Sequence, residues 1–178
     1  MSALPGALDV ALLVVTAAAG EARSGCLVGF ATQCSLEPER FLVCLSRANR
    51  TYEVAREATT LGVHVLGDGQ VELARWFGGT TDDRVDKLAA VDWRPGDGGA
   101  PLLDACAAWS EMRILEQLPL GDHVGFVVEP AASGAGDHRG ILRLSDVGPL
   151  APGHPGDDPP REHRPRGGAC PPGRAPTA

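Results

Sequence analysis

Two apolar runs near the start of the chain predict a pair of β-strands. Val and Leu dominate residues 7–16 and recur in residues 24–32, and Gly20-Glu21 between the runs supplies a turn. This arrangement is typical of a β-hairpin. The longest apolar stretch, residues 10–19, has ten residues, whereas a membrane-spanning helix needs about 20. Asp9 and the absence of a preceding Lys or Arg also argue against a secretory signal, so we interpret this stretch as a buried strand and expect no membrane association.

The next segment predicts a strand, a helix and a second strand. Residues 41–45 read Phe-Leu-Val-Cys-Leu without alternation, which suits a strand covered on both faces. Asn49 or Thr51 can cap a helix that runs to residue 58, and residues 61–66 return as a strand. Strands with so little polar alternation need cover on both faces, so we expect Val43, Leu45, Val63 and Val65 to leave apolar surface for a second subunit.

Helical patterns follow, and then strands again. An apolar stripe of Val71, Leu73, Ala74 and Phe77 predicts a helix that closes at Gly78-Gly79. A further turn or two is expected over residues 82–88 with Asp82 as the cap, and a loop over 96–99. Residues 108–118 alternate, with Glu111 and Arg113 on the polar side, and predict a half-buried strand. Gly121-Asp122 turns the chain into a strand over 124–128, and residues 141–144 predict a weaker last strand. The pattern predicts a mainly β protein, an antiparallel barrel with short helices.

Composition divides the chain into one domain and a tail. The chain has 178 residues, and nine of its fifteen prolines lie in residues 149–178, which show no apolar periodicity. We expect a domain over residues 1–148 and a Pro/Gly-rich disordered tail over residues 149–178. The alternative is an irregular arm that wraps a partner subunit.

Charge and cysteine spacing exclude several functions. The net charge of −7 argues against nucleic-acid binding. The five cysteines form no C-x-x-C pair and have no nearby His pair, so we expect no metal site. Their odd number and dispersed positions favour reduced thiols and a cytoplasmic location.

Three polar segments lie between the predicted strands. Ser46-Arg47-Ala48-Asn49-Arg50-Thr51 links a strand to a helix start, where free backbone N–H groups, short polar side chains and two arginines suit a phosphate. The alternative is a capped helix with two solvated arginines. The other segments are residues 29–35 and Gly121-Asp122-His123; adjacent residues of a strand point to opposite faces, so we do not expect Asp122 and His123 to form a catalytic pair. P-loop, Rossmann and nucleophile-elbow motifs are absent.

These segments, in this order, resemble the flavin reductase-like family of FMN-binding split barrels. The resemblance covers residues 10–128. Its pieces are Val14-Val15-Thr16, Ser35-Leu36-Glu37-Pro38, Leu45-Ser46-Arg47-Ala48-Asn49-Arg50-Thr51, Leu73-Ala74-Arg75-Trp76-Phe77-Gly78, Asp86-Lys87-Leu88, Gly99-Ala100-Pro101-Leu102-Leu103 and Gly121-Asp122-His123.

The resemblance implies a six-stranded antiparallel split barrel, a homodimer with flavin at the subunit interface, and an NAD(P)H-dependent flavin reductase. FMN, or alternatively FAD, would receive hydride from NADH or NADPH, and the reduced flavin would supply a separate monooxygenase. The implied flavin contacts are Gly29, Phe30, Ala31, Thr32, Gln33 and Cys34 for the ring and ribityl chain, and Ser46, Arg47, Asn49, Arg50 and Thr51 for the phosphate. His123 is implied to approach the flavin or nicotinamide and assist catalysis.

The chain departs from the family pattern before Ser35. The family's T-A-N-S falls on Leu27-Val28-Gly29-Phe30, so contacts to the flavin ring are expected from the backbone or from Thr32 and Gln33. Two further functions stay open: a flavin-binding electron carrier or sensor, and a relative that uses a deazaflavin.

Overall fold

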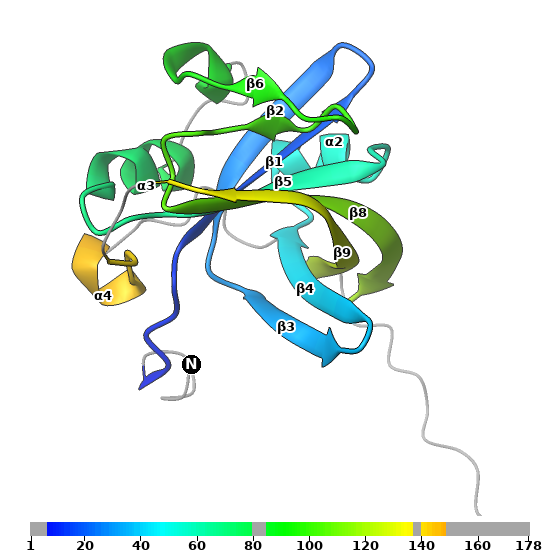
Figure 1. Ribbon diagram of the computed structural model, residues 1–178, viewed down its shortest axis with the longest axis horizontal. Helices are drawn as coiled ribbons and strands as arrows, with labels where there is room; N and C mark the ends of the chain where they lie inside the picture. Colours follow the sequence, from blue (N-terminus) through cyan, green and yellow to red (C-terminus); the bar gives the residue numbers. More distant parts are fainter. Residues whose placement is uncertain (1–6, 80–84, 137–139, 149–178) are drawn as a thin grey trace, which may run out of the picture.

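The computed structural model describes residues 7–79, 85–136 and 140–148. Within them seven strands form one antiparallel sheet in the order β2-β1-β5-β8-β9-β4-β3, and β6 and β7 form a separate pair (Figure 1). The bounds are β1 Leu13–Ala19, β2 Ala22–Val28, β3 Ala31–Leu36, β4 Glu39–Ser46, β5 Thr60–Val65, β6 Arg94–Pro95, β7 Pro101–Leu102, β8 Ala108–Pro119 and β9 His123–Ala135. The mainly β, antiparallel class is confirmed, with seven strands in the main sheet.

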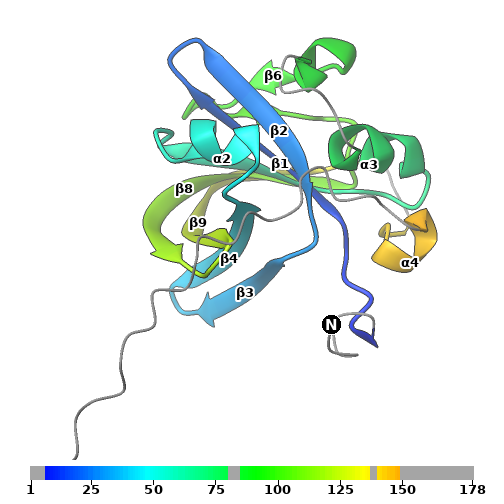
Figure 2. The ribbon, with the colours of Figure 1, turned by 180° about the vertical axis from the view of Figure 1, so that it is seen from behind.

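In the described part of the chain, three short α-helices and one 3-10 helix of known bounds accompany the sheet. They are α2 Arg50–Ala55, α3 Val71–Gly78, α4 Leu144–Val147 and the 3-10 helix η1 Lys87–Ala90. Helix α2 lies beside the β1–β2 hairpin, and α3 and α4 lie near each other on another side of the molecule (Figures 1 and 2). No helix of the described ranges is long and apolar enough to cross a membrane.

The predicted first hairpin is present, but the second apolar run divides into two strands. β1 pairs with β2 from Leu13↔Val28 to Ala19↔Ala22, and Gly20 turns between them with φ +57°. Residues 24–32 were expected to form one strand. Instead β2 ends at Val28 and β3 begins at Ala31, because β2 pairs with β1 whereas β3 pairs with β4. Gly29 and Phe30 therefore lie where the chain passes from one strand pair to the other.

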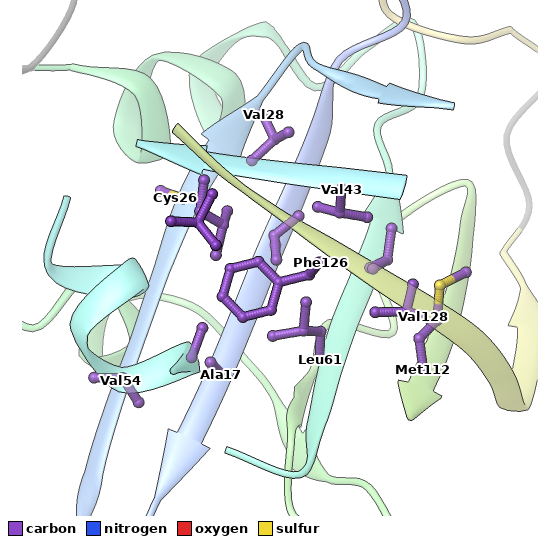
Figure 3. Packing of buried hydrophobic residues seen from close by; sticks show 14 residues of the cluster. Ala17, Cys26, Val28, Val43, Val54, Leu61, Met112, Phe126 and Val128 are labelled. Carbon is purple, nitrogen blue, oxygen red and sulfur yellow. The ribbon is translucent and has the colours of Figure 1, made fainter. Parts of the chain in front are cut away.

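The inner faces of the sheet enclose an apolar core around Phe126 (Figure 3). Val43, Leu45 and Val63 are buried in this core by the chain itself. The expectation that their strands leave apolar surface for a second subunit is therefore wrong for these three side chains. The barrel's own side chains supply the cover that their lack of alternation requires.

The last strand, expected over residues 141–144, is replaced by a short helix in the structure. Residues 141 and 143 make only isolated bridges, and helix α4 begins at Leu144 rather than a strand ending there. Asp9 explains this change, since its carboxylate accepts hydrogen bonds from the backbone N–H and hydroxyl of Ser145.

The expected cap Asp82 and the tail 149–178 lie outside the described residues. The 3-10 helix η1 is capped by Asp86, which accepts from the Leu88 N–H at 3.0 Å.

Glu111 of β8 is buried, although the strand pattern predicts a solvent-facing position. A register shift lies between Glu111 and Met112, and the Glu111 side chain is only 1% exposed. Its Oε1 accepts from the backbone N–H groups of Gly98 and Ala100 and from the Thr60 hydroxyl. A buried carboxylate needs such partners, and here two come from the connection between β6 and β7 and one from β5.

His64 of β5 is a buried histidine with both ring nitrogens hydrogen-bonded. Nδ1 lies 2.9 Å from the Val14 carbonyl oxygen, and Nε2 accepts from the Leu103 N–H at 3.0 Å. These partners fix the neutral ring with its proton on Nδ1, since a backbone N–H requires an acceptor. Burial lowers the pKa of His64 to about 4.

The pKa of His64 makes the stability of the fold depend on pH. In the unfolded chain the pKa is about 6.5, so as the pH falls the unfolded chain takes up the proton first. The neutral His64 ring contributes about 3 kcal/mol to the free energy of unfolding. This contribution is complete above pH 6.5 and is lost as the pH falls toward 4. We expect the urea midpoint of the wild type to fall between pH 6.5 and pH 4. In His64→Asn the midpoint should change less with pH, because the Asn side chain can donate to the Val14 carbonyl but does not titrate. Parallel pH profiles for the two proteins would contradict this assignment.

Candidate functional site

The β4–β9 ladder brings two of the three predicted segments together. Ser46 at the end of β4 lies opposite His123 at the start of β9. Arg47 joins the two segments further, because its backbone N–H donates to the Asp122 carbonyl at 2.9 Å and its Nε donates to the Gly121 carbonyl at 3.0 Å. The loop over residues 46–50 and the turn between β8 and β9 thus form one surface.

The first segment reaches this surface only at its beginning. The rings of Phe30 and His123 lie 5.3 Å apart at an angle of 59°, and Phe30 is 60% exposed. The Phe30 carbonyl is held by the Cys44 N–H at 2.9 Å. Beyond Gly29 and Phe30, β3 runs antiparallel to β4, so that Gln33 lies opposite Phe41. The exposed side chains of Thr32, Gln33 and Cys34 follow this edge strand away from His123, while Ala31 is half-buried.

Asp122 and His123 form a pair that the sequence analysis did not expect. His123 Nδ1 lies 2.9 Å from Asp122 Oδ1. The alternation argument was wrong here because Asp122 lies in the turn before β9 begins, and Gly121 at φ +94° sets the backbone of that turn. The hydrogen bond from His123, followed by its charge when protonated, lowers the pKa of Asp122. His123 Nε2 has no hydrogen-bond partner within the described ranges, so it can contact a ligand.

The loop over residues 46–50 is a capped helix start, as one of the two interpretations expected. The Asn49 side chain accepts from the Thr51 N–H at 2.9 Å, and the Ser46 hydroxyl accepts from the Ala48 N–H at 3.4 Å. Helix α2 ends at Ala55 rather than at residue 58. With only six residues it has a small dipole, so side-chain charge is the stronger attraction for a phosphate.

The predicted phosphate residues divide between the surface and the core. Arg47 and Arg50 are exposed and the side chains of Ser46 and Asn49 are half-buried. Thr51 is fully buried, and its hydroxyl lies 3.0 Å from the Ser24 hydroxyl of β2. Its hydroxyl therefore fixes α2 against the barrel wall and is turned away from the exposed loop.

An open hollow of about 880 Å³ lies against this loop. It is bounded by the tip of the β1–β2 hairpin, the loop and the exposed side of α2, which lie together in Figure 2. Its lining is Ala19, Gly20, Ala22, Arg47, Ala48, Asn49, Arg50, Glu53, Val54 and Glu57. Sequence analysis missed the hairpin tip and the two glutamates, although a helix running to residue 58 would have placed residues 50, 53 and 57 on one face; in the structure Glu57 lies just beyond the end of α2.

Comparisons with known proteins agree on one family. The model of the flavin reductase-like domain matches residues 6–142. A protein of Rhizobium meliloti (strain 1021) named probable flavin reductase is 36% identical over 123 residues, which cover 67% of this chain and 38% of that protein. The FMN reductase (NADH) RutF of Klebsiella pneumoniae is 33% identical over 116 residues, covering 65% of this chain and 70% of that protein.

A solved structure agrees as well. The NADH:FAD oxidoreductase SgcE6 of Streptomyces globisporus C-1027, in complex with NAD and FAD fragments, superposes with a TM-score of 0.70 at 29% identity, covering 79% of this chain and 83% of that one. The chain spans between 38% and 52% of the length of the first three curated relatives that it matches.

Asn49 gives a direct test of how the loop is built. We expect Asn49→Ala to lower the free energy of unfolding by about 1 kcal/mol, because the Thr51 N–H loses its acceptor. Asn49→Asp should retain wild-type stability, since a carboxylate caps a helix equally well. Urea unfolding of the three proteins measures both values, and equal stability of the Ala and Asp variants would show that the cap contributes nothing.

Proposed function

The chain belongs to the flavin reductase-like family, and on this basis we propose that it is an NAD(P)H-dependent flavin reductase. FMN is the proposed flavin, with FAD as the alternative, and NADH is the reductant that the names of two relatives favour. The observation that carries the proposal is the meeting of Phe30, His123 and Arg47 at one exposed surface. An aromatic ring, a histidine and a guanidinium suit a planar ring that bears a phosphate chain.

The residues at this surface fit a flavin. Phe30 offers an exposed aromatic ring for contact with the isoalloxazine, and His123 Nε2 offers either a donor or an acceptor. Arg47 keeps its Nη groups for a phosphate, since only its Nε has a hydrogen-bond partner within the described part of the chain. When bound, the flavin and the nicotinamide supply the hydride chemistry, and the protein supplies position and charge.

His123 is the proposed catalytic residue and Asp122 the residue that positions it. The carboxylate of Asp122 accepts from Nδ1, so it fixes the ring orientation and favours a proton on that atom. With its proton on Nδ1, a neutral ring would accept a hydrogen bond at Nε2, and a protonated ring would donate there and favour negative charge on a bound flavin. Hydride transfer needs no proton from His123, so its role is to assist.

The phosphate is proposed to lie at Arg47, Asn49 and Arg50, with Ser46 beside them. The side-chain oxygen of Asn49 is used by the helix cap, so its amide group is the part available to donate to a phosphate. Thr51 contributes by holding α2 through Ser24 rather than by direct contact. The ring and ribityl chain are proposed to follow Gly29, Ala31, Thr32, Gln33 and Cys34 along β3.

Assembly, partner and location belong to the same proposal. We propose a homodimer that covers the edge strand β3 and the residue before it, because Leu36 is 82% exposed and Phe30 is 60% exposed. Reduced flavin would pass to a separate monooxygenase in the cytoplasm. Residues 1–148 would carry these functions, and residues 149–178 would act as a dispensable tail.

The proposed activity is tested by mixing the purified protein with FMN and NADH and following absorbance at 340 nm. We expect consumption of NADH that depends on both flavin and protein. Flavin binding without NADH or NADPH consumption would favour the electron carrier or sensor, and a protein that neither binds flavin nor consumes NADH would overturn both.

His123→Ala should lower kcat/KM for NADH on the order of tenfold, which is about 1.4 kcal/mol of barrier. Asp122→Asn should lower it less, because the Nδ1–H keeps a weaker acceptor. FMN affinity is expected to change little in either variant. Wild-type kinetics for His123→Ala across pH 6 to 8 would remove His123 from the mechanism.

Asn49→Asp tests the phosphate position without disturbing the helix cap. The new carboxylate cannot donate to a phosphate and repels it, so FMN binding should weaken by roughly 1–3 kcal/mol. Riboflavin, which lacks the phosphate, should bind as to the wild type. Fluorescence titration measures both ligands, and an equal loss for the two would show that this loop does not hold the phosphate.

A further inference from the structure

We propose that Arg47 is a positioning residue, because its side chain selects the conformation of the β8–β9 turn in which Asp122 holds the His123 ring. This inference rests on the proposed function, in which His123 assists hydride transfer and the Nη groups of Arg47 bind the flavin phosphate. The second role of Arg47 needs no phosphate. It acts through the backbone of the turn and not through the ligand.

The β8–β9 turn has the φ pattern of a type II′ hairpin turn. The Leu120 N–H donates to the His123 carbonyl at 2.9 Å, which leaves Gly121 and Asp122 as the two central residues. Gly121 has φ +94°, whereas the φ of Asp122 is not positive. A positive φ at the first central residue alone is typical of type II′, and a positive φ at both central residues is typical of type I′.

The same two residues can also form a type I′ turn. Glycine adopts a positive φ freely and aspartate tolerates one, so the pair Gly121-Asp122 fits both types. Rotation of the peptide group between the two residues exchanges the types, since it reverses the Gly121 carbonyl and gives Asp122 a positive φ. The rotamers open to a side chain depend on its φ, so this rotation would change where the Asp122 carboxylate points.

Arg47 holds this peptide group in one orientation. Its Nε donates to the Gly121 carbonyl at 3.0 Å, and its backbone N–H donates to the Asp122 carbonyl at 2.9 Å. The backbone bond is available to any residue at position 47, whereas the Nε bond requires the guanidinium. A reversed Gly121 carbonyl would lose the Nε bond, so the Arg47 side chain favours the type II′ turn.

The observed turn places Asp122 beside the His123 ring. Asp122 Oδ1 lies 2.9 Å from His123 Nδ1, and within the described ranges no other side chain is hydrogen-bonded to this ring. The carboxylate therefore determines how the ring is oriented. Arg47 influences that orientation at one remove, since it fixes the backbone from which the carboxylate projects.

Two substitutions disturb the turn from opposite sides. Arg47→Lys keeps the positive charge but has a methylene group in place of the Nε–H. Gly121→Ala leaves the phosphate loop intact; its Cβ meets no atom within 4 Å, but φ +94° is strained for alanine. Arg75→Lys, at an exposed arginine of α3 that pairs with Glu72, is the matched control. Circular dichroism checks that each variant is folded.

Riboflavin separates the two roles of Arg47, because it has no phosphate. With riboflavin as acceptor, Arg47→Lys and Gly121→Ala should each lower kcat/KM for NADH about threefold, and Arg75→Lys should match the wild type. In a His123→Ala background, Arg47→Lys should cause no further loss, because the ring that it positions is gone. Wild-type rates with riboflavin, or an equal further loss without His123, overturn the inference.

A titration of the free protein separates this inference from the proposed function. The hydrogen bond from His123 lowers the pKa of Asp122, so carbon-13 NMR should show a higher pKa for this carboxyl group in Arg47→Lys and no change in Arg75→Lys. If the wild type does not reduce riboflavin, the titration alone decides: a raised pKa supports the inference, and an unchanged pKa overturns it. Failure to reduce FMN as well overturns the proposed reductase and leaves this result standing.

Discussion

The antiparallel register between β4 and β9 is the constraint on which the candidate site depends. Placing Ser46 opposite His123 fixes the start of the arginine-bearing loop beside the β8–β9 turn, although the two are far apart in the sequence. The same ladder places Val43 opposite Phe126 in the centre of the core. A shift of one residue would turn these side chains out of the barrel. Burial of apolar surface thus determines which polar ends meet.

Polar groups inside the barrel fix the other side of the sheet, around β1 and β5, because each has a defined partner. His64 connects β5 to the Val14 carbonyl of β1 and to Leu103, and the Thr16 hydroxyl donates to the Pro101 carbonyl at 2.5 Å. Buried polar groups without partners are costly, so an alternative packing would lose these bonds as well as apolar contacts. Along the described chain, every buried side-chain nitrogen and oxygen atom has a hydrogen-bond partner.

The sequence predicted the elements better than their contacts. Apolar runs and the Gly20 turn were sufficient for the β1–β2 hairpin, and side-chain spacing was sufficient for helix α3, because these features depend on neighbouring residues. The division at Gly29 was missed, since it depends on which strand each half pairs with. Glu111 was missed because the loop that satisfies its carboxylate becomes visible only in three dimensions.

The site shows the same division between local and distant information. Its three segments were identified from the sequence, and the Asn49 cap was among the expected alternatives. Two contacts were not predictable, because each joins residues that are distant in the chain. They are the ring contact of Phe30 with His123 and the hydrogen bond between the hydroxyl groups of Thr51 and Ser24. The Asp122–His123 bond depends on where β9 begins, and strand ends are the least certain part of a pattern-based prediction.

Arg47 has a consequence for the thermodynamics of ligand binding. Its backbone and its Nε already hold the β8–β9 turn in the free protein, so one residue fixes two loops relative to each other before any ligand arrives. A ligand that spans both loops does not have to order them, and the conformational entropy of that step is lost during folding instead. The two loops should accordingly behave as one rigid body in the free and bound states.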